Sequence, residues 1–287
     1  MPELPEVETV AENLRRHALG RRVEDVWCSR ARLRGREVVD PRALRAHAVG
    51  RTIERVWRRG KYLVCELSGE GALLFHLGMS GHLHLAAADE PRPPHTHVAF
   101  RLGPRRGGHR RRASVEELRF VDPRRFGLCR ALPRAALAAT PALARLGPEP
   151  LEPGFTVAVL AAALRGSRRE VKTLLLDQTR VAGVGNIYAA EALFLAGIHP
   201  KTPAGRLGAA RVARLHLAVR EVLGDAIANG GTTLRDFTDP EGRPGAHRVR
   251  LRVYDRDGQP CVECGATVRL IVQAQRSTFY CPRCQRR

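Results

Sequence analysis

The stretch CVECGATVRLIVQAQRSTFYCPRC, residues 261–284, decides the fold of the C-terminal end of this chain. It holds two Cys-x-x-Cys pairs, Cys261 with Cys264 and Cys281 with Cys284, and 16 residues separate the pairs. Two tight turns can each present two sulfurs to one tetrahedral ion, as in four-thiolate zinc sites. The pattern predicts one structural Zn²⁺ with no coordination position open for catalysis. A vestigial site that has lost its metal is the alternative.

The residues between the two cysteine pairs are prone to form strands, with a polar break at Gln275-Arg276-Ser277-Thr278. Zinc supplies the closing energy that so short a segment could not obtain from a core of its own. A hairpin held in this way would point the polar break outward. Arg276 is therefore a candidate contact for a phosphate or a nucleic-acid groove.

The charge of the chain indicates a polyanionic partner. Its 287 residues include 49 Lys and Arg against 29 Asp and Glu, a formal net charge of +20, and most of the excess is Arg. Guanidinium groups suit phosphate oxygens, and binding to nucleic acid gains free energy from released counterions. A GC-rich genome that encodes Arg freely is the alternative explanation.

The other three cysteines, Cys28, Cys65 and Cys129, are scattered through strand-like stretches, where a buried thiol is the ordinary explanation. This distribution is typical of a reduced, cytoplasmic protein rather than of a disulfide framework. No signal-peptide pattern opens the chain, and no run approaches the ~20 apolar residues that span a bilayer. We expect a cytoplasmic, nucleoid-associated monomer without membrane contact.

The upstream sequence divides into a strand-rich half and a helix-rich half. Short strands that turn at Gly and Pro follow one another from residue 23 to residue 132, which predicts an antiparallel sandwich. Within them, the Arg- and Gly-rich segment 103–114 resembles an inserted hairpin tip, and we assign it no function. Five prolines in 133–153 separate the halves. Periodicity then predicts four helices, Val157–Leu164, Arg169–Thr179, Asn186–Ala196 and Ala209–Asn229.

The N-terminus, Pro2-Glu3-Leu4-Pro5-Glu6, offers a nucleophile just before a predicted helix. Met is generally removed before a small residue such as Pro, which would leave Pro2 as a free secondary amine. Its attack on a sugar C1′ would give a cationic iminium that eases loss of the 3′ phosphate. Glu3 and Glu6 are within reach by sequence for proton transfer. An ordinary start with two acids at a helix N-terminus is the alternative.

Two loops between strands suggest a wedge for DNA. The loop Asp122-Pro123-Arg124-Arg125-Phe126-Gly127 would expose a ring beside a guanidinium. The Phe126 ring can fill the gap left by an extruded base, and Arg124 can take the edge of the orphaned partner. Met79, on a turn flanked by glycines, is a further candidate. The alternatives are a Phe126 folded inward and a Met79 that only fills the core.

Two positions suggest phosphate contacts. Lys61 follows Gly60 just past a predicted hairpin turn. Asn186 follows Gly185 at the start of a predicted helix, where the first turn offers N–H groups to a phosphate. Capping of the helix is the more common role for an Asn at this place.

Together these motifs resemble the formamidopyrimidine-DNA glycosylase family over nearly the whole chain and in the same order. The matching stretches are Pro2 to Thr9, Arg59 to Tyr62, His76 to Gly81, Asp122 to Gly127, Gly183 to Tyr188, Gly230 to Leu234, and Gln275-Arg276 with the four cysteines. The resemblance implies an α+β multidomain fold with an N-terminal antiparallel β-sandwich flanked by helices, a helix–two-turn–helix domain and a C-terminal zinc-finger β-hairpin. Damaged double-stranded DNA would bind in the cleft between the domains.

The expected domain limits are 1–135 for the catalytic sandwich, 136–153 for a linker, 154–248 for the helix–two-turn–helix domain with a lesion-capping loop, and 249–287 for the zinc finger. By resemblance Pro2 is the nucleophile that forms a Schiff base at C1′, Glu3 is the general acid/base and Glu6 supports it. Lys61, which we place with the catalytic set, joins Asn186 and Arg276 in a phosphate clamp. The void left by the extruded base would be filled by Met79, Arg124 and Phe126, with Arg124 reading the opposite cytosine.

The implied reaction is base-excision repair: removal of 8-oxoguanine and formamidopyrimidines, then β,δ-elimination at the resulting abasic site. Ala246-His247 stands where the family usually carries aromatic residues, in a loop that covers the extruded base in many members, so the preferred lesion stays open. An endonuclease VIII-like preference for oxidised pyrimidines is one alternative. A zinc-dependent DNA-binding protein without enzymatic activity is the other.

Overall fold

The computed structural model describes residues 1–29, 33, 39–87, 89–105, 116–234 and 237–286. Most of the predicted insertion 103–114 lies outside these residues. The chain forms two compact units. The first, which we call the sandwich unit, is Met1–Ala144 with Gly230–Ala246; the second, the helical unit, is Arg145–Asn229 with His247–Arg287.

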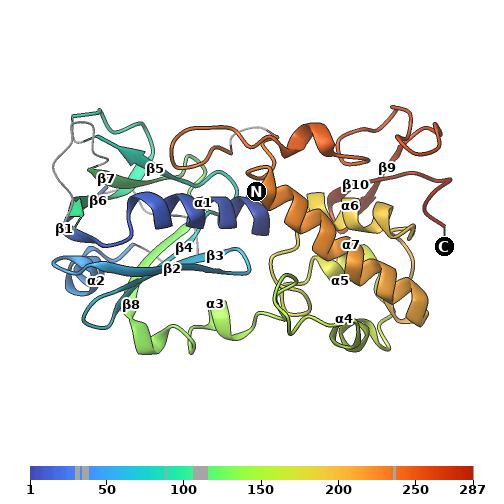
Figure 1. Cartoon of the computed structure of the whole chain (residues 1–287), viewed down its shortest axis with the longest axis horizontal. Helices are drawn as coiled ribbons and strands as arrows, with labels where there is room; N and C mark the ends of the chain where they lie inside the picture. The colour runs from blue at the N-terminus through green and yellow to red at the C-terminus, as the bar shows by residue number, and fades with distance from the viewer. Residues whose placement is uncertain (30–32, 34–38, 88, 106–115, 235–236, 287) are drawn as a thin grey trace. The chain divides into compact units, whose positions relative to one another are not determined.

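The sandwich unit contains two four-stranded antiparallel sheets (Figure 1). The first has the order β1-β6-β7-β5, with strands Arg21–Cys28, Thr96–Arg105, Glu117–Val121 and His82–Ala86. The second has the order β2-β3-β4-β8, with strands Ile53–Arg59, Tyr62–Leu67, Gly71–His76 and Leu128–Pro133. One apolar core takes side chains from both sheets, which confirms the predicted antiparallel sandwich.

Helix α1, Leu4–His17, packs its apolar stripe into the same core. The stripe is Val7, Val10, Ala11 and Leu14. Its N-terminus is stabilised by Glu6, whose carboxylate accepts a hydrogen bond from the backbone N–H of Glu3. Basic residues occupy its last turn, near the negative end of the helix dipole. The helix therefore places the chain's first residues beside the sandwich core.

A second helix in this unit, α2 at Pro41–Ala48, was missed by the sequence analysis, which named only strands between residues 23 and 132. Asp40 caps it by accepting hydrogen bonds from the N–H groups of Arg42 and Ala43, and Pro41 occupies the first turn. Only Leu44 and Ala48 are buried. The cap signal was present in the sequence, but two buried residues make too weak a periodic pattern to reveal a two-turn helix.

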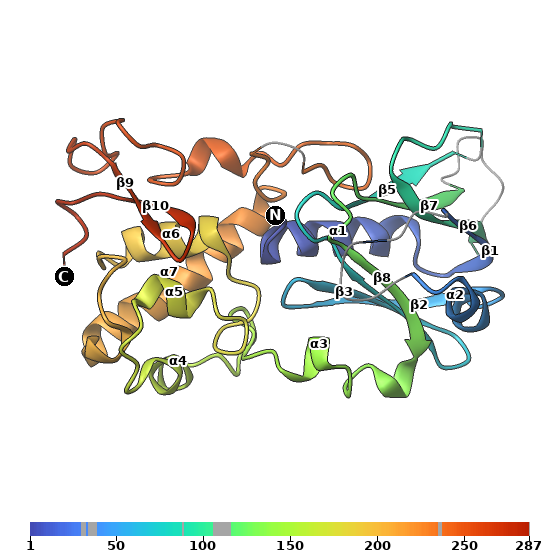
Figure 2. The ribbon, with the colours of Figure 1, turned by 180° about the vertical axis from the view of Figure 1, so that it is seen from behind.

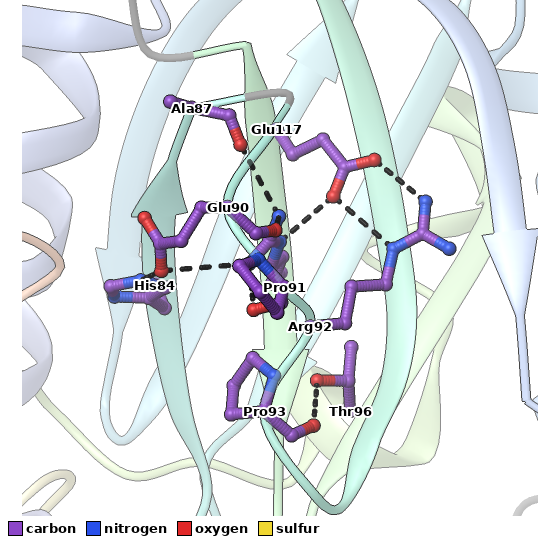
Figure 3. Close-up of polar contacts among 9 residues, drawn as sticks. His84, Ala87, Glu90, Pro91, Arg92, Pro93, Thr96 and Glu117 are labelled. Atoms are coloured by element: carbon purple, nitrogen blue, oxygen red, sulfur yellow. Dashed lines mark hydrogen bonds and ion pairs between the residues drawn. The ribbon is translucent and has the colours of Figure 1, made fainter.

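A buried arginine, Arg119, donates to the carbonyl of Glu90 between β5 and β6. Figure 3 shows Glu90 with Arg92 and Glu117, the other charged residues of this region. Arg119, on the inner strand β7, is 1% exposed; its Nε donates to Glu117 at 2.8 Å and its Nη2 donates to the carbonyl of Glu90 at 2.6 Å. Arg92 pairs with Glu117 at 2.6 Å and lies over the ring of Trp27. Burial raises the pKa of Glu117, but the hydrogen bonds from Arg92 and Arg119 outweigh it and hold that pKa below its usual value.

Replacing Arg119 by Met should lower the free energy of unfolding by about 3 kcal/mol, because one partner of a buried pair is left without the other and backbone carbonyls lose their donor. The loss stays at the lower end of the usual range because Arg92 still pairs with Glu117. Urea unfolding followed by circular dichroism measures it. Arg134→Met, which removes an exposed pair with Glu54, is the matched control and should change stability little. A change below 1 kcal/mol for Arg119→Met would contradict the account.

The helical unit contains α4 (Val157–Leu164), α5 (Val171–Leu175), α6 (Asn186–Leu195) and α7 (Ala209–Ala228), and the short α3 (Pro141–Ala144) precedes it in the sandwich unit. Helix α5 is shorter than the predicted Arg169–Thr179, because Asp177 accepts hydrogen bonds from Thr179 and forms a turn there instead. Strands β9 (Arg269–Gln273) and β10 (Arg276–Tyr280) form the predicted hairpin, and β10 packs beside α6 (Figures 1 and 2). None of the described helices has the length and apolarity needed to cross a membrane.

Candidate functional site

Glu6 joins the N-terminus to a segment more than two hundred residues away. Its carboxylate is fully buried; one oxygen accepts from the Glu3 N–H at 2.8 Å and the other from the Thr232 N–H at 2.7 Å. Gly231 has φ 78°, and a Cβ there would lie 3.0 Å from the nearer Glu6 oxygen. Glycine permits both the backbone conformation and the close approach. The segment 230–246 is thereby held against the start of α1.

Pro2 and Glu3 are both buried at this place, directly before α1. In the chain as described, Met1 precedes Pro2 and is 48% exposed, so the Pro2 nitrogen is part of a peptide bond. Removal of Met1 would convert it into a secondary amine next to two buried carboxyl groups. The structure thus brings three of the predicted catalytic residues together: Pro2, Glu3 and Glu6.

Lys61 directly follows Gly60 at the β2–β3 turn and is 6% exposed. It acts on His76, a residue to which the sequence analysis gave no role. Burial and the Lys61 charge lower the pKa of His76 to about 4. Its Nδ1 accepts from the Gly78 N–H at 3.0 Å, so the neutral ring carries its proton on Nε2. His76 is therefore a donor beside a cation, which suits an anionic oxygen. Its place opposite Tyr62 is visible only once β3 and β4 are paired, so no local sequence signal revealed it.

His76 should make the protein less stable in mild acid. Its pKa in the folded state, about 4, lies below its unfolded value near 6.5, so the unfolded chain binds the extra proton more readily. The contribution of His76 to the free energy of unfolding is therefore complete above pH 6.5. It is lost as the pH falls towards 4, and the total loss is at most about 3 kcal/mol. Denaturant unfolding of wild type and His76→Gln at several pH values measures it. If the free energy of unfolding falls equally with pH in wild type and His76→Gln between pH 6.5 and 4, the low pKa of His76 is contradicted.

The turn that carries Met79 and the loop that carries Arg124 and Phe126 are locked together. The buried carboxylate of Asp122 accepts from Ser80 Oγ and from the Gly127 N–H, both at 2.7 Å. Ser80 Oγ in turn accepts from the N–H of Arg124 at 3.1 Å. The sequence analysis quoted Asp122 and Ser80 only as parts of motifs, because a bond across 42 residues leaves no local signal.

The three predicted wedge residues lie at the surface of this locked pair. Met79 is 44% exposed and Phe126 is 46% exposed, so the Phe126 side chain is not folded into the core. The Arg124 guanidinium lies 5.5 Å from the Phe126 ring centre, in cation–π distance. Gly78 allows the close approach, since a Cβ there would lie 2.7 Å from the Gly127 nitrogen. The structure places Met79, Arg124 and Phe126 in one exposed cluster.

Replacing Asp122 by Ala should lower the free energy of unfolding by about 2–3 kcal/mol, because two donors lose a buried charged acceptor. Ser80→Ala removes one of those hydrogen bonds and should cost about 1 kcal/mol. Urea titrations of the two variants and of Asp122→Ala/Ser80→Ala measure the effects. The double variant should lose less than the sum of the single losses, because both changes remove the same bond. Strict additivity would show that the bond does not hold the two turns together.

In the helical unit, Asn186 contacts the zinc-finger hairpin and does not cap α6; the cap position is Gly185. Its Nδ2 donates to the carbonyl of Ser277 at 3.0 Å and lies 3.4 Å from the hydroxyl of Tyr254. Among the described residues its buried Oδ1 has no hydrogen-bond partner. The sequence analysis left two roles open for Asn186, helix capping and a phosphate contact. The structure shows that Asn186 does not cap the helix.

Arg276 is the exposed first residue of β10. The hairpin turn is Ala274-Gln275, both with positive φ, as a tight two-residue turn requires. Behind Arg276, the buried Lys172 donates to the Ser277 carbonyl at 2.9 Å and to Thr278 Oγ1 at 2.7 Å. Asn186 and Arg276 are therefore brought to the same hairpin, through a shared neighbour, Ser277.

His247 is turned into the helical unit rather than exposed. It is 3% exposed, its ring centre lies 6.0 Å from that of Tyr188, and its Nδ1 lies 3.7 Å from Asp225. Burial lowers the pKa of His247, the nearby Asp225 charge opposing the shift. Because the side chain is buried there, His247 is a packing residue in this structure, while its neighbour Ala246 is exposed.

The four thiols of the C-terminal segment fit a zinc ion. Cys261, Cys264, Cys281 and Cys284 have sulfur atoms within 4.8 Å of one another. Cys261 Sγ and Cys284 Sγ are 3.9 Å apart, and Cys264 Sγ and Cys281 Sγ are 3.5 Å apart. A tetrahedral ion with Zn–S bonds of about 2.3 Å requires sulfur separations near ~3.8 Å. The donor set and its spacing therefore fit one structural Zn²⁺.

These features define a class of protein: a zinc-finger protein with a β-sandwich unit whose first helix starts at a buried proline and two buried acidic residues. Sequence profiles then identify all three parts. The formamidopyrimidine-DNA glycosylase N-terminal domain matches residues 1–129, the H2TH domain of the same enzymes matches residues 146–238, and the zinc finger found in FPG and IleRS matches residues 258–287. The chain belongs to the formamidopyrimidine-DNA glycosylase family, and is thus a DNA glycosylase of base-excision repair.

Individual relatives agree over the full length. The formamidopyrimidine-DNA glycosylase of Aromatoleum aromaticum is 47% identical over 287 residues, covering all of both chains. The crystal structure of the MutM (Fpg) protein of Thermus thermophilus superposes with a TM-score of 0.85 at 42% identity, covering 99% of this chain and 98% of that one. A Lactococcus lactis FPG variant in complex with a Fapy-dG containing DNA has a TM-score of 0.89 at 33% identity, with full coverage of both. The predicted fold class and the zinc finger are confirmed.

Proposed function

We propose that this protein is a bifunctional DNA glycosylase and abasic-site lyase that removes oxidised purines, 8-oxoguanine and formamidopyrimidines, from duplex DNA. The observation that carries the proposal is the burial of Pro2 beside two buried carboxyl groups, with Glu6 fixed by two backbone N–H groups. An amine at this place can act only after Met1 is removed. The Lactococcus FPG complex with Fapy-dG DNA supports the substrate class.

The proposed reaction begins when the Pro2 nitrogen lone pair attacks C1′ and the bond from C1′ to the damaged base breaks, the base leaving with a proton. A proton from Glu3 then opens the sugar ring, which gives the cationic iminium between Pro2 and C1′. Loss of a C2′ proton expels the 3′ phosphate, and a second elimination expels the 5′ phosphate. Glu6, held by Glu3 and Thr232, keeps the nucleophile in place.

The remaining predicted residues would hold the DNA. We propose that Lys61, Asn186 and Arg276 bind phosphates around the extruded nucleotide, and that Met79, Arg124 and Phe126 fill the space it leaves. Extrusion costs a few kcal/mol, which damage at the base pair partly offsets. The exposure of all three wedge residues supports this assignment.

We also propose the domain limits 1–135, 136–153, 154–248 and 249–287. We further propose that the protein acts as a monomer on nucleoid DNA in the cytoplasm.

Borohydride trapping across a panel of lesions tests the proposal. Borohydride reduces the iminium to a stable amine, so the protein should become covalently joined to duplexes that contain 8-oxoguanine opposite cytosine or a formamidopyrimidine. Undamaged duplex is the control and should give no adduct. Faster processing of thymine-glycol duplexes than of 8-oxoguanine duplexes would favour the endonuclease VIII-like alternative. No adduct with any lesion would contradict the Pro2 Schiff base and the abasic-site lyase step.

A further inference from the structure

Four arginines line a groove of the helical unit that the proposed function does not use. The groove has a volume of about 480 Å³ and lies between the segment 248–256 and the first zinc turn. Its arginines are Arg248, Arg250, Arg252 and Arg256. They recur in the sequence HRVRLRVYDR, residues 247–256, which the family motifs quoted above leave out. Gln259 and Val262 form the wall on the side of the zinc turn.

The groove keeps a positive charge after its internal ion pairs are counted. Arg250 Nε donates to Asp225 at 2.9 Å, and Arg248 lies 3.7 Å from Asp255. Four of the residues that line the groove are arginines and one, Asp255, is acidic, so the arginines outnumber the acids in its lining. The pairs are at the surface, where the side chains of Arg248 and Arg250 are 56% and 53% exposed, so a ligand with a higher charge density can compete for them.

The backbone of the groove is held rigidly. The buried carboxylate of Glu191 accepts from the N–H groups of Arg252, Val253 and Tyr254 at 2.9, 3.0 and 2.8 Å. Arg256 donates to the carbonyls of Arg252 and Pro260, both at 3.1 Å. A ligand therefore meets arginines whose main chain is already ordered, which reduces the entropy lost on binding.

The groove adjoins one of the proposed phosphate contacts. Tyr254 lines the groove, and its hydroxyl lies 3.4 Å from Nδ2 of Asn186. Through Tyr254, the arginine groove and Asn186 are therefore neighbours within the same unit. Successive phosphates of one DNA strand lie along such a path, and arginine forks bind them without reading the base sequence.

We propose that this arginine groove binds backbone phosphates of the duplex arm that flanks the damaged nucleotide, next to the phosphate assigned to Asn186. The inference rests on the proposed function. The arginine groove adds affinity for duplex DNA and does not affect which lesion is chosen. Two exposed valines in the groove, Val249 and Val262, also suit an acidic peptide with an apolar side chain, but the continuity with Asn186 favours DNA.

The test compares the full-length zinc-loaded protein with Arg248→Gln/Arg252→Gln. Arg256 is left intact because it holds two carbonyls. Fluorescence anisotropy gives the Kd for a duplex with a tetrahydrofuran abasic analogue between about 50 and 200 mM KCl, since each phosphate contact contributes about 0.9 to the slope of log Kd against log salt. The slope should fall by about 1–2, with about tenfold weaker binding at low salt. Single-turnover cleavage at saturating 8-oxoguanine DNA should not change.

Two controls separate a groove contact from net charge and from misfolding. Arg42→Gln/Arg45→Gln on α2 removes the same charge elsewhere and should keep the wild-type slope. The variant Arg248→Lys/Arg252→Lys keeps both charges and should retain most of the wild-type salt slope. Shortening the duplex arm on one side of the lesion should abolish the difference between wild type and the Gln variant, and shortening the other arm should not.

An unchanged slope in the Gln variant, with zinc content and Tm as in wild type, would overturn the proposal and leave the groove to an acidic peptide. A Lys variant that behaves like the Gln variant, with reduced Tm, would also overturn it, as evidence of a structural role. Failure of the proposed function would look different: the wild type itself would show no preference for damaged duplex and no borohydride adduct.

Discussion

Pro2→Ala in the processed protein should cut DNA at abasic sites at least about a hundredfold more slowly than wild type. Both processed proteins present an α-amino group at the same place in the chain, so amine nucleophilicity alone does not separate them. The difference lies in the intermediate: a secondary amine gives an iminium that is always cationic, whereas a primary amine gives an imine that must take up a proton. A misplaced or missing proton costs about 10²–10⁴ in rate.

Single-turnover cleavage and borohydride trapping measure this effect on the same duplex. Glu3→Gln is the matched variant: it keeps the Pro2 amine but removes a group that transfers protons, so it should lose base excision by a similar factor. Intact mass must first show that Met1 is absent from every sample. Full lyase activity in processed Pro2→Ala would refute the assignment of Pro2 as the nucleophile.

Loss of the zinc ion should have the second large effect. Cys281 is one of the four clustered thiols, is 0% exposed to solvent, and packs in an apolar cluster with Val253, Val268 and Phe279. Structural zinc contributes about 10–16 kcal/mol to the folding of zinc-finger peptides. Cys281→Ser should therefore unfold the hairpin that carries Arg276 and weaken binding to damaged duplex more than about a hundredfold, while the sandwich unit stays folded.

Metal analysis and anisotropy check this outcome, and thermal unfolding reports whether the sandwich unit persists. Cys28→Ser is the control, because Cys28 lies in β1 outside the metal cluster and should leave zinc content unchanged. A chelator applied to wild type should reproduce the Cys281→Ser result. Wild-type affinity in a protein shown to be free of zinc would refute a structural role for the metal.

Features with local causes could be predicted from the sequence. The hairpin between the cysteine pairs follows from spacing, and α4, α6 and α7 follow from periodicity to within one residue at each end. The β2–β3 hairpin follows from two strand-like runs that flank the turn at Arg59-Gly60. In each case the residues that decide the structure are close together in the chain, so their pattern can be read without the fold.

Features with distant causes could not be predicted. The carboxylate of Asp122 joins two loops that are 42 residues apart, and the low pKa of His76 depends on burial and on a lysine from another strand. The ring of His247 faces Tyr188 only because the segment after Ala246 packs onto the helical unit. Such contacts become visible only once the strands are paired, and they govern how the candidate residues are held.

The bond between Glu6 and Thr232 also bears on how the protein is made. The sandwich unit has its last strand by residue 133, yet it also includes residues 230–246, so about a hundred residues must be translated before it is complete. At roughly 5–20 residues per second this is a delay of about 5–20 s. During that interval the nascent chain has its N-terminal amine but lacks the segment that anchors Glu6. A chain that ends before residue 230 therefore lacks the Thr232 N–H that holds one oxygen of Glu6, and under the proposed function its catalytic site would be incomplete.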